Sequence, residues 1–205
     1  MTGDDRLRQS VSRETLERLE VYEALLIKWN AAINLVSPQT LSQVWSRHFL
    51  DSAQIFDLSS PNTRHWADLG SGGGFPGMVV AILSKEHRTD MQISLVESDQ
   101  RKSAFLGTVA RTLDLPVQIH PKRIEQLAPL QADVLSARAL ASLTQLLAFS
   151  ERHLSPEGTA VFPKGIRWRE ELAEAQKTWS FGYDAVPSRT DADAVILKIE
   201  GLKRV

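Results

Sequence analysis

The sequence predicts an α/β fold in which a doubly wound, mostly parallel sheet follows a helical N-terminal extension. Strand-like and helix-like segments alternate after about residue 61, an order that is typical of a parallel sheet with helices on both faces. A glycine-rich loop follows the first strand-like segment, and the first 60 residues show only helical periodicity. We therefore expect a single domain over 1–205, built from a helical extension (1–60) and an α/β core (61–205).

The extension is expected to hold two helices. Ser12 suits an N-cap, and apolar side chains then recur at helical spacing, at Leu16, Leu19, Leu26, Trp29 and Ile33. The Ser-Pro pair at 37–38 interrupts this pattern, because the residue before a proline avoids helical geometry. A second helix is expected over about 40–56.

The core elements follow in alternation. Strands are expected at 65–70, 92–97, 116–120, 133–137 and 158–162, and helices at 76–85, 100–113, 142–154 and 167–179. The last two segments, 181–187 and 194–200, are expected to close the sheet as an antiparallel pair. Ligands of such sheets bind beyond the carboxyl ends of the parallel strands, so the loops at those ends should form the site.

Composition excludes several classes of protein. The chain has no cysteine, which excludes disulfides and thiolate metal sites, and the acids beyond Asp68 and Glu97 form no convincing cluster, so no metal site is expected. No apolar run approaches 18 residues and the N-terminus lacks an apolar signal core, so we expect a cytoplasmic protein without a membrane partner. The formal net charge of −1 means that any contact with nucleic acid must come from local patches.

The loop at 68–77, D-L-G-S-G-G-G-F-P-G, is typical of a nucleotide pocket. Its glycines let a ligand approach the backbone, and the loop leads into a helix N-terminus with free backbone donors. One frame, 72–77, fits the G-x-G-x-x-G fingerprint of dinucleotide sites. The other frame, 68–74, fits the D-x-G-x-G-x-G loop of S-adenosylmethionine (SAM) enzymes. A carboxylate at Asp68 would repel a pyrophosphate and attract the cationic groups of SAM by roughly 4 kcal/mol at about 4 Å, which favours SAM.

Glu97 ends the next strand and suits a partner for both ribose hydroxyls, although it could merely lead into the following helix. The missing cysteine excludes cytosine-C5 methylation, and 136–139, S-A-R-A, lacks the Asn/Asp-Pro-Pro-aromatic element of exocyclic amine methylation. A ring nitrogen such as guanine N7 needs no general base and only alignment with the methyl group. The residues alone leave open whether the substrate is rRNA, another RNA or a small molecule.

Four elements resemble the RsmG/GidB family of bacterial 16S rRNA guanine-N7 methyltransferases. They are 28–35 (K-W-N-A-A-I-N-L), 47–52 (R-H-F-L-D-S), the loop at 68–77, and the pair of segments S-A-R-A at 136–139 and P-K-G at 163–165. The resemblance covers about 12–200. It implies a Rossmann-like class I SAM-dependent methyltransferase that methylates N7 of guanine-527 in the 530 loop of 16S rRNA. The expected partner is 16S rRNA in the 30S subunit or an assembly intermediate, and the expected oligomeric state is a monomer.

The resemblance also implies roles for single residues. The expected SAM contacts are Asp68, Gly70, Phe75, Glu97, Ile124, Glu125 and Arg138. No residue is required as a general base, and Arg138 is expected to position either the methionine end of SAM or the target base, with a structural salt bridge as the alternative. For Ile124 and Glu125, the start of a short helix is the alternative.

The RNA contacts expected from the same resemblance are Asn34, Arg47, His48 and Lys164. The first three could instead fasten the extension to the sheet. We expect Trp29 to be a core residue and Asp51 to pair with Arg47 at i, i+4.

Overall fold

The computed structural model describes residues 3–205. The extension consists of α1 (Gly3–Ser10), α2 (Arg13–Asn30), a 3₁₀ segment (Pro38–Gln43), a π-helical turn (Trp45–Leu50) and α3 (Asp51–Phe56). The core continues with β1 (His65–Leu69), α4 (Gly77–His87), β2 (Gln92–Val96), α5 (Gln100–Thr112), β3 (Val117–His120), a 3₁₀ turn (Ile124–Gln126), β4 (Ala132–Ala137), α6 (Leu143–His153), β5 (Leu154–Lys164), α7 (Trp168–Ala175), β6 (Trp179–Pro187) and β7 (Val195–Arg204).

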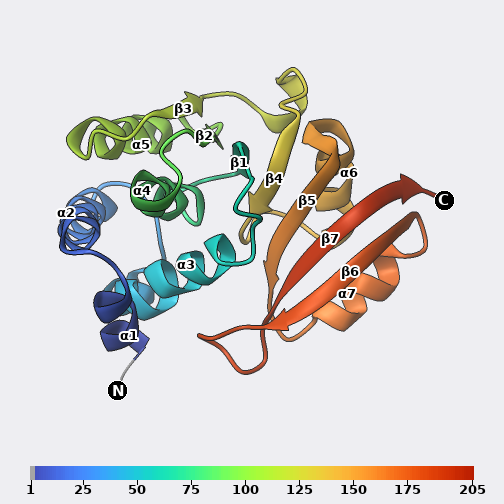
Figure 1. Ribbon diagram of the computed structural model, residues 1–205, viewed down its shortest axis with the longest axis horizontal. Coiled ribbons are helices and arrows are strands. Elements are labelled where there is room, and N and C mark those ends of the chain that lie inside the picture. Colours follow the sequence, from blue (N-terminus) through green and yellow to red (C-terminus); the bar gives the residue numbers. More distant parts are fainter. Residues whose placement is uncertain (1–2) are drawn as a thin grey trace.

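The seven strands form one sheet in the order β3-β2-β1-β4-β5-β7-β6 (Figure 1). Strands β1 to β5 pair in parallel, whereas β7 runs antiparallel to both β5 and β6. The predicted α/β fold class, with its mostly parallel sheet and its antiparallel final pair, is confirmed. The strand order reverses between β1 and β4, and the carboxyl ends of these two strands are where a ligand crevice is expected.

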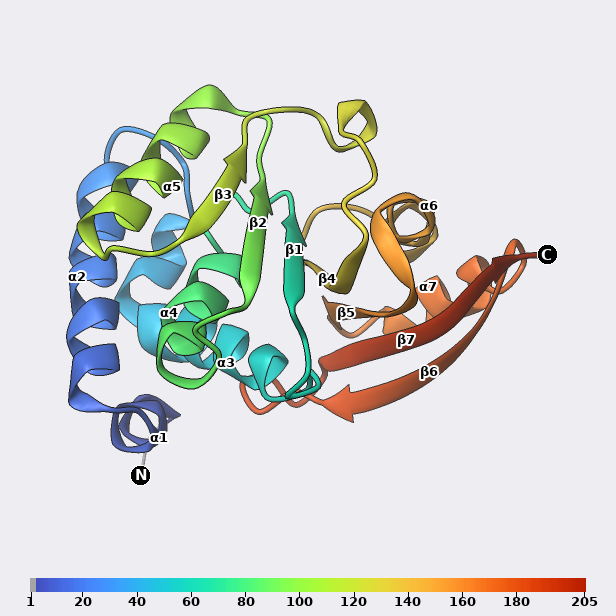
Figure 2. The ribbon, with the colours of Figure 1, turned by 45° about the horizontal axis from the view of Figure 1, so that its top comes forward.

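Helices cover both faces of the sheet (Figure 2). One face shares a hydrophobic cluster with α2, α3, α4 and α5, in which Tyr22, Phe49 and Trp66 are buried. The other face packs against α6 and α7 through a second cluster that includes Leu135 and Phe162. Trp29 packs against Phe105 with a ring separation of 5.7 Å, so the prediction that it belongs to the core is confirmed.

Side-chain caps begin three of the predicted helices. Ser12 Oγ accepts a hydrogen bond from the backbone N–H of Thr15 at 3.2 Å, and Ser142 caps α6 in the same way. Asp99 accepts bonds from the backbone of the first turn of α5. Each cap stabilises its helix by about 1 kcal/mol, and this local chemistry explains why these starts were predictable.

Several elements differ from expectation, and β5 begins at Leu154 instead of at 158. The predicted helix at 40–56 is divided into a 3₁₀ segment, a π-helical turn and α3. Helix α1 was not predicted. Trp179 begins β6 instead of ending a helix, because its buried ring packs under the Arg204 guanidinium of the paired strand, 4.7 Å from the ring centroid. Among residues 3–205, no helix combines the length and apolar character needed to cross a membrane.

Candidate active site

The glycine loop after β1 is held by hydrogen bonds from its backbone N–H groups to the Ser71 carbonyl and to the carboxylates of Asp68 and Glu97. The N–H groups of Gly72, Gly74, Phe75 and Gly77 all donate hydrogen bonds within the protein. Gly72 has φ +56°, a left-handed conformation that favours glycine, and a Cβ there would meet no protein atom closer than 3.8 Å. At Gly77, a Cβ would collide with the side chains of Leu95 and Asp68, so this glycine lets α4 pack closely on the sheet.

Asp68 lies beneath this loop and is fully buried. Its Oδ1 accepts a hydrogen bond from Ser136 Oγ at 2.7 Å, and its Oδ2 accepts one from the Gly77 N–H at 3.2 Å. Burial raises the pKa of Asp68 to about 6, although the bonds from Ser136, Ser71 and Gly77 oppose this shift. Asp68 is not among the residues that line the two cavities described below, and its Oδ2 acts directly on the loop through the Gly77 N–H.

Glu97, at the end of β2, supports the loop from the other side. Its Oε2 accepts a hydrogen bond from the Gly72 N–H at 2.9 Å, and its Oε1 accepts one from the Asp99 N–H at 2.8 Å. The side chain lines a cavity of about 410 Å³, which we call the smaller cavity. A carboxylate oxygen can accept more than one hydrogen bond, so Glu97 keeps acceptor capacity beyond these two bonds.

The smaller cavity brings together most of the expected cofactor residues. It is lined by Gly70, Gly72, Val96, Glu97, Ser98, Lys102, residues 122–125, residues 138–141, Gln145 and Phe149. Ile124 and Glu125 therefore lie in its wall, within the 3₁₀ turn. His153 Nε2 donates a hydrogen bond to the Ile124 carbonyl at 3.0 Å and holds this turn in place.

Phe75 lies behind the cavity. It is 4% exposed and stacks on His48, with ring centroids 4.8 Å apart, and on Tyr22. The Arg138 guanidinium carbon lies 4.9 Å from the Phe75 ring centroid. Phe75 thus joins the extension to the loop, and it is not among the residues that line the smaller cavity.

A larger cavity of about 630 Å³ adjoins the smaller one and shares the segment 138–141 with it. The expected RNA residues Arg47, His48 and Lys164 line this larger cavity, together with Asp51, Glu171 and Thr190. Asn34 is exposed and lines neither cavity. The other asparagine of the motif at 28–35, Asn30, is buried, and its side-chain oxygen accepts hydrogen bonds from the Leu35 and Val36 N–H groups.

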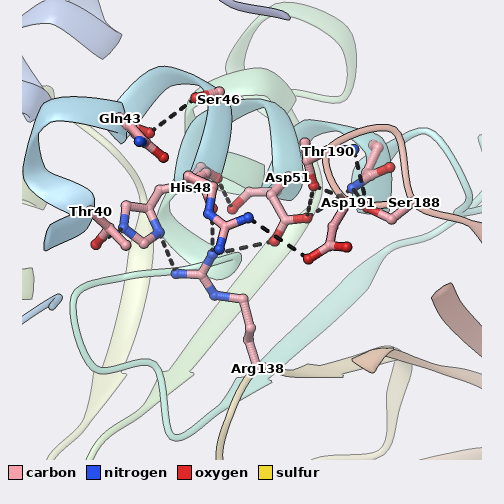
Figure 3. Close-up of polar contacts among 12 residues, drawn as sticks. Thr40, Gln43, Ser46, His48, Asp51, Arg138, Ser188, Thr190 and Asp191 are labelled. Atoms are coloured by element: carbon pink, nitrogen blue, oxygen red, sulfur yellow. Dashed lines mark hydrogen bonds and ion pairs between the residues drawn. The ribbon is translucent and has the colours of Figure 1, made fainter. Parts of the chain in front are cut away.

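Arg138 joins the two cavities to the extension (Figure 3). Its Nη1 lies 3.3 Å from Asp51 Oδ2 and donates to the Arg47 carbonyl at 3.2 Å. Its Nη2 lies 2.9 Å from His48 Nδ1. Arg138 therefore forms the salt bridge that the sequence analysis gave as the alternative, and it also lines both cavities, so its expected role toward SAM or the base stays a prediction.

His48 is neutral in this arrangement. Burial and the guanidinium groups of Arg138 and Arg47 lower the pKa of His48 to about 3. Since an arginine can only donate, Nδ1 of His48 is the acceptor, and the ring proton sits on Nε2, 2.9 Å from Thr40 Oγ1.

The prediction that Arg47 and Asp51 form an ion pair is wrong. Asp51 pairs with Arg138, and Arg47 lies 3.8 Å from Asp191 instead. These two residues lie in and directly after the π-helical turn, whose spacing differs from the α-helical i, i+4 spacing on which the prediction depended.

Lys164, at the end of β5, is 8% exposed. Its Nζ donates to the Ala141 carbonyl at 3.1 Å and to Glu171 Oε2 at 2.8 Å. The same Glu171 oxygen accepts a bond from the Leu143 N–H. Lys164 and Glu171 therefore hold the segment shared by the two cavities.

Sequence reasoning missed the contribution of the β6–β7 loop, residues 188–194, which supplies Ser188, Thr190 and Asp191 to the larger cavity. No motif marks this loop, and its place follows only from the insertion of β7 between β5 and β6. A hollow of about 720 Å³, between α4, α5 and β3, contains none of the predicted site residues.

Comparison with known proteins identifies the family of this chain. Residues 15–193 match the family model described as rRNA small subunit methyltransferase G. The chain is 55% identical, over 96% of both chains, to ribosomal RNA small subunit methyltransferase G of Ruegeria pomeroyi.

Solved structures share the fold at low identity. A methyltransferase from Geobacter sulfurreducens superposes with a TM-score of 0.61 at 12% identity, covering 96% of this chain and 93% of that one. TYW2 from M. jannaschii, in complex with AdoMet, gives a TM-score of 0.57 at 12% identity over 85% and 80% of the two chains. These two structures support the Rossmann-like fold, and the sequence matches show that the chain belongs to the family of ribosomal RNA small subunit methyltransferase G.

Proposed function

We propose that this methyltransferase transfers the methyl group of SAM to N7 of a guanine in 16S rRNA, namely guanine-527 in the 530 loop. The observation that carries the proposal is the pair of adjoining cavities at the carboxyl end of the sheet, which share one wall at 138–141. A donor in one cavity and an acceptor base in the other would meet at this wall. The family resemblance supplies the choice of nucleotide.

The residues of the smaller cavity fit SAM. Glu97 can accept from the ribose hydroxyls, and Ile124 and Phe149 offer apolar surface to the adenine. The ammonium and carboxylate groups of the methionine part of SAM would both find partners of opposite charge, because the wall of this cavity holds carboxylates and cations. A dinucleotide fits less well, since the loop N–H groups that would hold its pyrophosphate already donate within the protein.

The charges of the larger cavity suit a neutral base. Each of its cations pairs with a carboxylate of the same wall: Arg47 with Asp191, Arg138 with Asp51, and Lys164 with Glu171. Such paired groups offer hydrogen bonds without a net field, which favours a base edge over a phosphate. The target base must leave its stack to enter, and an unpaired loop base leaves at the least cost.

The chemistry requires alignment and no proton transfer. When bound, SAM supplies the methyl group and a neutral thioether as leaving group. The in-plane lone pair of guanine N7 forms the N–CH₃ bond as the S–CH₃ bond breaks, and the positive charge passes to the guanine ring. Because no proton leaves, neutral His48 needs no role as a base and can position Arg138. Holding the two reactants in line is the contribution that the protein makes.

The 30S subunit, or an assembly intermediate of it, is the proposed partner of a monomeric enzyme acting in the cytoplasm. The test is incubation of the purified protein with labelled SAM and 30S subunits that lack the modification, followed by mapping of the labelled nucleotide. Label at N7 of guanine-527 is the expected result. Label on another RNA, or on a small molecule but not on 30S subunits, would contradict the proposed substrate. Gly72→Val serves as the inactive control, because its side chain would enter the smaller cavity.

A further inference from the structure

Asp51 binds two parts of the molecule with its two carboxylate oxygens. Oδ2 lies 3.3 Å from Arg138 Nη1, while Oδ1 accepts hydrogen bonds from Thr190 Oγ1 and Gln54 Nε2, both at 2.9 Å (Figure 3). The Asp51 and Arg138 side chains are only 16% and 19% exposed. In such a partly buried place an ion pair holds its geometry better than on an open surface.

The β6–β7 loop is fastened to the extension around this carboxylate. The Arg189 N–H donates to Gln54 Oε1 at 2.8 Å, and the Arg189 guanidinium pairs with Asp57 at 2.8 Å. On the other side of Thr190, Asp191 pairs with Arg47. The loop therefore has several attachments. Two of them lead to Arg138: Asp191 through Arg47, whose backbone carbonyl accepts from Arg138, and Thr190 through the carboxylate of Asp51, which is the ionic partner of Arg138.

The two ends of this connection face different cavities. Thr190 lines the larger cavity and is not among the residues of the smaller one, whereas Arg138 lines both. A shift of the loop is thus transmitted to the smaller cavity through two contacts, from Thr190 to Asp51 and from Asp51 to Arg138. His48 is neutral and contacts Arg138 by one hydrogen bond. Asp51 is therefore the negatively charged partner that holds the Arg138 guanidinium in position.

We propose that Asp51 is a positioning residue that couples the two cavities, so that the β6–β7 loop sets the affinity for the methyl donor through Arg138. The proposal rests on the proposed function for the identity of the ligands. It predicts that a change at Thr190 weakens SAM binding, although Thr190 does not line the SAM cavity, and that Asp51 is required for this effect.

A double-mutant cycle tests the coupling. The dissociation constant of SAM is measured by calorimetry for the wild type, Thr190→Val, Asp51→Asn and the double variant. Residues in contact usually show coupling, so we expect Thr190→Val to weaken SAM binding about 2-fold or more in the wild type and to have no further effect in Asp51→Asn. Thr190→Ser keeps the hydroxyl and should retain the wild-type affinity. Thr63→Val, which alters a buried threonine outside both cavities, is the matched control.

A merely structural role for Asp51 gives a different result. Melting temperatures would fall, but Thr190→Val would then leave SAM affinity unchanged, or would weaken it by the same factor in both backgrounds, and either outcome would overturn the coupling. Should Asp51→Asn fail to fold, the comparison of Thr190→Val with Thr190→Ser decides, since equal SAM affinities would refute the proposal. A wild type that binds SAM without methylating 16S rRNA would overturn the proposed function alone, and one that does not bind SAM would overturn both.

Discussion

Replacing Asp68 with asparagine should change how the stability of the protein depends on pH. The carboxyl group is fully buried, and its pKa in the folded protein is about 6, compared with an ordinary value of 3.8. The fold therefore favours the neutral form. The stability that this group contributes is fully present below about pH 4 and is lost as the pH rises through about 6, because the unfolded chain gives up the proton first.

The magnitude follows from the pKa difference. Each pKa unit corresponds to 1.36 kcal/mol, so the full effect is about 3 kcal/mol. Between pH 5 and pH 8, where the protein can be handled, linkage gives a loss of about 1.4 kcal/mol in the free energy of unfolding. Asparagine does not titrate, and Asp68→Asn should gain this amount relative to the wild type over the same interval.

Urea denaturation of both proteins at several pH values measures the difference, in which the contributions of all other groups cancel. Ser136→Ala is an informative companion, because it removes a hydrogen bond that favours the ionised form of Asp68, and its loss of stability with rising pH should be larger than in the wild type. If the difference between the wild type and Asp68→Asn stays constant from pH 5 to pH 8, the buried carboxyl does not titrate as inferred.

Three further substitutions test the site. Gly72→Val should lower SAM affinity by at least about 10-fold, because the valine places a branched side chain in the smaller cavity and the loss of about 1.4 kcal/mol changes affinity tenfold. Calorimetry that shows wild-type affinity would refute the loop assignment. Arg138→Ala should reduce the methylation rate by about 100-fold, as expected for a lost positioning contact. It should also lower the free energy of unfolding by about 1–3 kcal/mol, because Asp51 loses its charged partner. Full activity would contradict the shared-wall interpretation. Lys164→Ala should weaken binding of 30S subunits more than binding of SAM, since Lys164 lines only the larger cavity, and the reverse order in filter-binding and calorimetric assays would count against its placement.

Features encoded locally were predictable from the sequence. The starts of α2, α5 and α6 depend on capping side chains within the first turn, and the order of the core strands along the chain follows from alternating patterns. Glu97 was proposed because parallel strands place their carboxyl ends at one edge of the sheet, whereas the role of Arg138 came from the family resemblance.

Features that depend on distant contacts were missed. The segment at 45–50 looks like an ordinary helix, and its π-helical turn lies where His48 meets Arg138, 90 residues further along the chain. Helix α1 is short and polar, and its docking rests on tertiary contacts such as Arg8 over the Trp45 ring. The burial of Asp68 likewise depends on how α4 packs, so the rise in its pKa could not be predicted from its place near the end of a strand.

The antiparallel insertion of β7 has a consequence for the time order in which the larger cavity forms. Its wall joins Asp51 to Thr190, which are separated by 139 positions in the chain. During synthesis, the glycine loop and its supports leave the ribosome long before the β6–β7 loop does. The lining of the smaller cavity is complete in the chain by Phe149, whereas the wall of the larger cavity is complete only when the last two strands have docked, so the larger cavity is the later of the two to form.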